Sequence, residues 1–85
     1  MSENAASAIS ESQPAQVHPL ACVDPKAELA EGVVISPGAV VGPEVRIGAH
    51  TWIGPNAVLD GRLTIGSHNR IFPGACLGQE PQDLK

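Results

Sequence analysis

The hydrophobic positions of this 85-residue chain recur with a period of six. From Val17 to Leu77, every sixth residue is Val, Ile or Leu, eleven times in succession. The series is Val17, Val23, Leu29, Ile35, Val41, Ile47, Ile53, Leu59, Ile65, Ile71 and Leu77. A short fixed period of this kind is the signature of a repeat architecture and decides the fold class before any other pattern.

The other positions of each hexad have their own preferences. With the aliphatic residue as position 1, position 2 is often Gly, as at Gly42, and position 3 is often Pro, as at Pro43. Position 5 is mostly small or aliphatic, as at Val45. Because side chains alternate between the two faces of a strand, positions 1 and 5 can both point inward, while positions 2 to 4 form a turn that suits Gly and Pro. A helical period of 3.6 does not fit.

In hexapeptide solenoids, three hexads make one turn of a triangular coil. We therefore expect an all-β fold, a parallel β-helix of about three and a half coils: coil 1 (17–34), coil 2 (35–52), coil 3 (53–70) and a partial coil 4 from residue 71. Connections between parallel strands are normally right-handed, and the known solenoids of this kind are a left-handed exception. The left-handed expectation comes from that resemblance.

The repeat also sets the expected boundaries. Residues 1–16 are rich in Ser, Ala, Glu and Gln, and we expect a flexible tail, with a short N-terminal helix as the alternative. Residues 17–78 form the β-helix. The next position 1 is Asp83, whose carboxylate would be costly in an aliphatic core. Residues 79–85 are therefore expected to leave the coil as a loop, and a break in a regular repeat is where function is best placed.

Composition narrows the partners. The net charge is −4, and the five basic residues are spread out, so nucleic acid is not an expected partner. No apolar run approaches about 18 residues, so membrane insertion is not expected. The first sixteen residues contain no Lys or Arg and no apolar segment, which argues against a secretory signal and favours a cytoplasmic location.

Histidine and cysteine are the candidate metal ligands. His50 and His68 are eighteen residues apart and should stack at one corner, about 5 Å apart. A zinc site needs three or four ligands, and His18 falls on another part of the coil. The further histidines of a gamma-type carbonic anhydrase are missing, so no metal is expected. Cys22 and Cys76 lie three coils apart, about 14 Å, too far for a disulfide.

Three further polar residues have structural interpretations. Asp24 and Asp60 share a face two coils apart, about 10 Å, which is too loose for a carboxylate pair. Asn69 occupies position 5, and we expect it to point inward with its amide bonded to the backbone.

Two stretches resemble a particular family. The segment VHPLACVDPKAELAEGVVISPGAVVGPEVRIG is similar to the opening coils of the UDP-N-acetylglucosamine O-acyltransferases of lipid A biosynthesis. The segment NRIFPGACLGQEPQDLK resembles the place where that family leaves its regular coils, and the run Gln82 to Lys85 is its most specific element. The resemblance covers residues 17–85.

The resemblance implies a cytoplasmic homotrimer that transfers a 3-hydroxyacyl chain from acyl carrier protein to the 3-hydroxyl of UDP-N-acetylglucosamine, with no metal or other cofactor. It implies substrate binding by Asp83 and Lys85, with Gln82 as a weaker candidate. A histidine is the family's general base, a role that suits its pKa range. As an alternative, Asp83 and Lys85 are simply loop charges.

One departure from the family is large. The family's catalytic histidine lies several coils after the QDLK run, and His18, His50 and His68 do not match it. No catalytic residue is therefore assigned, and we expect the chain to be the N-terminal part of such an enzyme, inactive and poorly folded alone. The alternatives are a non-catalytic hexapeptide scaffold and another hexapeptide acyl- or acetyltransferase.

Overall fold

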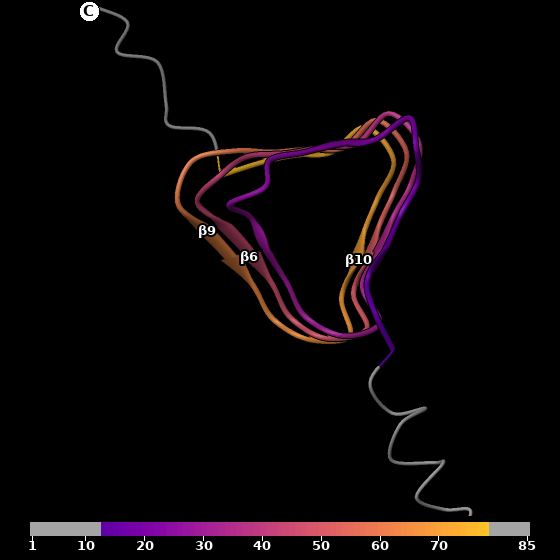
Figure 1. The fold of residues 1–85 in the computed structure, drawn as a ribbon. Helices are drawn as coiled ribbons and strands as arrows, with labels where there is room; N and C mark the ends of the chain where they lie inside the picture. The colour runs from indigo at the N-terminus through magenta and orange to yellow at the C-terminus, as the bar shows by residue number, and fades with distance from the viewer. Residues whose placement is uncertain (1–12, 79–85) are drawn as a thin grey trace, which may run out of the picture.

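The computed structural model of the protein describes residues 13–78, which form short parallel strands stacked in a triangular coil (Figure 1). Three sheets make the three sides of the triangle. Sheet A contains β1 (Gln16–Val17), β4 (Val34–Ile35), β7 (Trp52–Ile53) and β10 (Arg70–Ile71). Sheet B contains β2 (Cys22–Val23), β5 (Val40–Val41), β8 (Val58–Leu59) and β11 (Cys76–Leu77). Sheet C contains β3 (Glu28–Leu29), β6 (Val45–Ile47) and β9 (Leu63–Ile65). The all-β solenoid predicted from the hexads is confirmed.

The register between coils is eighteen residues throughout. Val17 pairs with Ile35, Ile35 with Ile53, and Ile53 with Ile71, all in parallel. Sheets B and C repeat the same offset. Each aliphatic residue at position 1 therefore lies directly over its counterpart in the next coil, as the sequence predicted.

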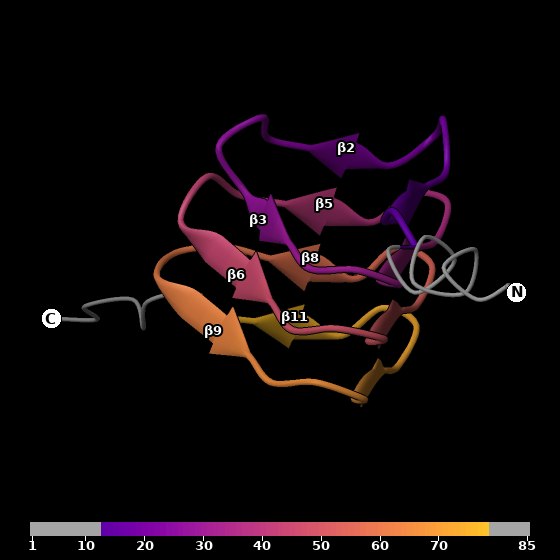
Figure 2. The same cartoon turned by 60° about the horizontal axis from the view of Figure 1, so that its bottom comes forward.

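The handedness can be followed in the figures. In Figure 1 the chain rises along the side of β10, crosses the top and descends along β6 and β9, which is an anticlockwise path. Figure 2, in which the bottom of that view has come forward, has the N-terminal coil uppermost, so in Figure 1 this coil is the one nearest the viewer. An anticlockwise path that recedes from the viewer is a left-handed coil, the expected exception to the right-handed rule.

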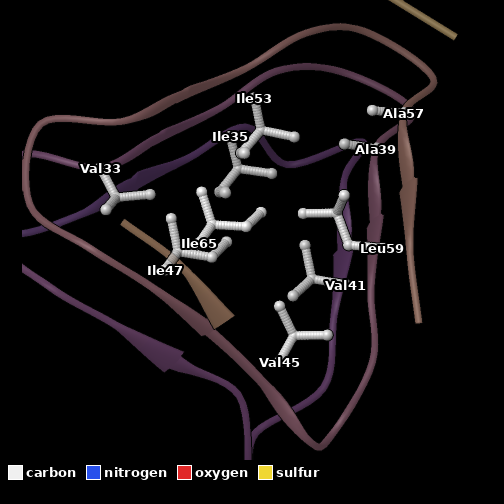
Figure 3. Packing of buried hydrophobic residues seen from close by; sticks show 10 residues of the cluster. All are labelled: Val33, Ile35, Ala39, Val41, Val45, Ile47, Ile53, Ala57, Leu59 and Ile65. Carbon is white, nitrogen blue, oxygen red and sulfur yellow. The ribbon is translucent and has the colours of Figure 1, made fainter. Parts of the chain in front are cut away.

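The core consists of hexad positions 1 and 5 of the middle coils (Figure 3). Its buried members point from all three sides toward the axis: Val33, Ile35, Ala39, Val41, Val45, Ile47, Ile53, Ala57, Leu59 and Ile65. The same positions are less covered in the end coils, and Val17 is 42% exposed. Burial thus comes from stacking between coils, because one coil cannot cover its own aliphatic residues.

Hexad position 4 has a left-handed backbone conformation at two of the three corners. His50, Asn56 and His68 have φ values of 58°, 61° and 59°. Gly occupies the equivalent positions at Gly32, Gly38 and Gly74, whereas Leu20 in the first coil has no positive φ. Gly, Asn and His are residue types that tolerate this region, whereas β-branched residues are strained there. The two stacked histidines therefore have a backbone reason for their position.

The inward polar residue is Thr51, and the expectation for Asn69 was wrong. Thr51 is fully buried, and its Oγ1 donates to the Gly66 carbonyl at 2.8 Å and accepts the Asn69 N–H at 3.3 Å. Asn69 itself is exposed, because no described coil lies over it. Its side chain makes no hydrogen bond within residues 13–78. A buried hydroxyl with two partners carries no desolvation penalty of its own.

Candidate functional site

The residues assigned to substrate binding from the sequence, Gln82, Asp83 and Lys85, lie outside the described residues. The described chain ends just after β11, at Gly78, at the corner between sheets B and C, here called the B–C corner. A Cβ atom on Gly78 would lie 3.0 Å from the Cβ of Leu63 in β9. The chain thus reaches the QDLK segment from a point in contact with the start of sheet C.

A groove of about 400 Å³ runs along the B–C corner and the outer side of sheet C. Leu63, the neighbour of Gly78, is one of its lining residues. The remaining lining residues are mostly charged: Lys26, Glu28, Pro43, Glu44, Val45, Arg46, Arg62 and Thr64. Five charged side chains from three coils thus line this groove.

The charges in the groove alternate from one coil to the next. Arg46 Nε lies 3.5 Å from Glu28 Oε1, and Arg62 Nε lies 3.9 Å from Glu44 Oε2. The four side chains are 60% to 88% exposed, so each pair stabilises the fold by at most about 1 kcal/mol. Guanidinium donors beside carboxylate acceptors suit a ligand that carries both anionic and hydroxyl groups.

The two stacked histidines lie at a different corner, between sheets C and A. Their ring centroids are 5.2 Å apart with an interplanar angle of 28°, close to the predicted spacing. His50 Nε2 is 3.8 Å from Glu31 Oε2. The His50 ring fills the space into which a side chain on residue 32 would project, so Gly is required there. Within residues 13–78 no group of three His, Cys, Asp or Glu side chains has metal-binding geometry. The pair is therefore best explained by the turn geometry.

The remaining candidates stay apart, as the coil phase predicted. Cys22 and Cys76 are free and exposed, on the first and last strands of sheet B. His18 lies at the corner between sheets A and B, where its Nδ1 accepts the Leu20 N–H at 3.0 Å. Asp24 and Asp60 accept backbone N–H groups within their own turns. Structural interpretations suffice for all of them.

Sequence reasoning missed the charged groove. The signal was present in the eighteen-residue spacing of Lys26, Glu44 and Arg62, which alternate in sign, and of Glu28 and Arg46, which do the same. It also missed the Arg70 guanidinium, which lies 5.2 Å from the centre of the Trp52 ring, its neighbour in the next coil. Phasing the charged residues by coil, as was done for the aliphatic ones, would have found both.

Comparisons with known proteins do not assign the chain to a family. Within the described part of the chain there is no helix long and apolar enough to cross a membrane. The sequence matches no model of a known protein family, and a search of curated proteins finds no match either. What the chain does must therefore be argued from its coil geometry and its local sequence.

Proposed function

We propose that residues 17–85 are the N-terminal coils of an acyltransferase that moves a 3-hydroxyacyl chain from acyl carrier protein to the 3-hydroxyl of UDP-N-acetylglucosamine, the first step of lipid A biosynthesis. The observation that carries the proposal is the regular coil stack that directly precedes the QDLK run in the sequence. An uninterrupted hexad ladder leads the chain to Gly78, which lies beside Leu63 of the charged groove and precedes Gln82 by four residues in the sequence.

The chemistry of this region fits a nucleotide sugar. A diphosphate and several sugar hydroxyls call for cationic donors next to carboxylate acceptors, and Arg46, Arg62 and Glu44 line the groove. Lys85 is proposed to meet phosphate or carbonyl oxygens, and Asp83 to accept a hydrogen bond from a sugar hydroxyl. Gln82 has the weaker role of a neighbouring contact.

The chain is not proposed to supply the catalytic base. A general base must reach the hydroxyl that it deprotonates, within about 3 Å or through one water. His18 caps its own turn, and His50 and His68 stack on each other at the corner between sheets C and A, away from the groove. We therefore expect no acyl transfer by the 85-residue chain alone, measured with acyl carrier protein and UDP-N-acetylglucosamine; turnover above background would contradict this.

A hybrid enzyme tests the proposal directly. The chain would replace the corresponding coils of a UDP-N-acetylglucosamine O-acyltransferase, whose own later coils supply the histidine base. We expect the hybrid to transfer the acyl chain. In it, Lys85→Ala should lower kcat/KM by about tenfold to a hundredfold, because a hydrogen bond to a charged group contributes about 1.5–3 kcal/mol.

Lys26→Ala in the same hybrid is the matched control. It removes the same charge from the far end of the groove, on the first coil, and should change kcat/KM much less. A folded hybrid that lacks activity, or equal losses from Lys85→Ala and Lys26→Ala, would contradict the assignment of the QDLK run.

A second candidate is a non-catalytic scaffold that serves assembly. The observation that favours it is the exposed apolar outer face of sheet B, which no described part of the chain covers. A folded hybrid without transfer activity, made from a chain that still associates through that face, would favour the scaffold over the enzyme.

A further inference from the structure

The outer face of sheet B differs from those of the other two sheets. Its outward residues form one column across the four coils, Cys22, Val40, Val58 and Cys76. Both cysteines are exposed and free, and Val40 is 40% exposed. The equivalent column of sheet C begins Glu28, Arg46, and that of sheet A contains Trp52 and Arg70. Sheet B alone presents an uncharged column.

This column reads the same in both directions: Cys, Val, Val, Cys. We propose that the outer face of sheet B docks against the same face of a second copy of this chain, related by a two-fold axis that runs along the strand direction between β5 and β8. Such an axis reverses the order of the coils and keeps the strand direction. Cys22 then faces Cys76 of the second copy, and Val40 faces its Val58.

The residues that follow the strands are complementary under the same operation. Directly after the four strands of sheet B come Asp24, Gly42, Asp60 and Gly78. With the coil order reversed, Asp24 meets Gly78 of the second copy and Asp60 meets its Gly42. Each carboxylate thus faces a residue without a side chain, and no two aspartates oppose each other.

The residues before the strands follow the same rule. Hexad position 4 at the corner between sheets A and B is Leu20, Gly38, Asn56 and Gly74 in the four coils. The two-fold operation places Leu20 opposite Gly74 and Asn56 opposite Gly38. Leu20 is 73% exposed in the single chain, a large apolar side chain without cover. Both borders of the face therefore pair bulky residues with glycines.

Charge complementarity supports the same arrangement. At the B–C corner, Glu44 belongs to coil 2 and Arg62 to coil 3, and both side chains are well exposed. Reversing the coil order brings Glu44 of one copy to Arg62 of the other, twice by symmetry. A two-fold axis parallel to the coil axis would keep the coil levels but reverse the strand direction. It would place the B–C corner opposite the corner between sheets A and B of the second copy, so Glu44 and Arg62 would lose this pairing.

The contact is small. Its four strands span about 14 Å at the usual strand spacing, which puts the buried area at the low end for protein pairs and makes the association weak and exchanging. The faces of sheets A and C remain free, so this contact is compatible with the homotrimer that the resemblance implies. It does not depend on the proposed acyl transfer.

Single-cysteine variants of the 85-residue chain test the proposal. Cys22→Ser and Cys76→Ser each keep one exposed thiol. With diamide as oxidant, which takes up the two hydrogens as two thiols become a disulfide, the mixture of the two variants should form covalent dimers. The rate should exceed that of either variant alone by about tenfold or more, because docking raises the effective concentration of the facing thiols.

Two outcomes would overturn the two-fold contact. One is equal or faster cross-linking in the separate variants, which would bring equivalent cysteines together, as in a parallel assembly. The other is equally slow cross-linking in all three samples. Val40→Asp in both variants should abolish the advantage of the mixture, since it opposes a buried carboxylate to Val58, whereas Thr64→Asp on the outer face of sheet C should leave it unchanged.

Discussion

Gly48 and Gly66 occupy the same hexad position in adjacent coils but differ in the space around them. A Cβ atom on Gly48 would lie 2.6 Å from the carbonyl carbon of Gly66 and 2.7 Å from the nitrogen of Ser67. On Gly66 the nearest atom would be the side-chain nitrogen of Asn69, at 3.5 Å. The first environment is rigid backbone of the next coil, and the second is an ordinary contact with a mobile side chain.

Gly48→Ala should therefore force coils 2 and 3 apart. Bringing the closest contact from 2.6 Å to an ordinary 3.4 Å needs a shift of about 0.8 Å. The same shift would stretch the hydrogen bond from Gly48 N to the Ile65 carbonyl, now 2.7 Å, to about 3.5 Å, the limit of a useful bond. Loss of that bond together with the strain should lower the free energy of unfolding by about 2–4 kcal/mol.

Gly66→Ala is the matched control. Neither glycine has a positive φ, so alanine is free of backbone strain at both positions. At Gly66 it should change stability by no more than about 1 kcal/mol, in the stabilising direction, because alanine restricts the unfolded chain. Urea denaturation followed by Trp52 fluorescence, and thermal melts by circular dichroism, measure the difference. The melting temperature of Gly48→Ala should fall by about 8 °C or more.

Equal effects of the two substitutions would refute the reasoning. So would a melting temperature of Gly48→Ala that matches the unmodified chain. Either result would mean that the spacing between coils adjusts freely, and that Gly at hexad position 2 is a matter of turn preference and not of contact between coils.

Two further predictions follow from the core. Ile53 is fully buried and flanked by coils on both sides, so Ile53→Ala should lower the free energy of unfolding by about 2–5 kcal/mol, as measured by urea denaturation. Ile71→Ala in the last coil should lower it clearly less, and the reverse order would contradict burial by stacking. Thr51→Val keeps the shape of the side chain but leaves the Gly66 carbonyl and the Asn69 N–H without their partner, which should lower the free energy of unfolding by about 1–3 kcal/mol. Thr64→Val on the outer face of β9 should change it by no more than about 0.5 kcal/mol, and similar losses at both sites would show that the hydrogen bonds of the buried hydroxyl do not stabilise the fold.

The sequence by itself determined the coil. Positions 1 and 5 of most hexads carry aliphatic or small residues because both face the axis. The period, together with the three-hexad coil of known hexapeptide solenoids, predicted the three sheets, the eighteen-residue register and the inward ladder of Ile35, Ile53 and Ile71. The same phase correctly kept Cys22 from Cys76 and brought His50 next to His68. A short repeat leaves little freedom, because every residue has neighbours at fixed offsets.

Only the tertiary structure decided which residues of the end coils are buried and which side chains meet at the corners of the triangle. Thr51 and Asn69 occupy the same hexad position, yet only Thr51 is buried, because coverage depends on a coil above and not on the local pattern. The charged residues of the groove come from three coils and can be aligned by their eighteen-residue spacing, but the hollow that they line at the B–C corner is a property of the stacked coils. The self-complementary face of sheet B is equally invisible along the chain, because reversing the coil order is an operation on the stacked strands.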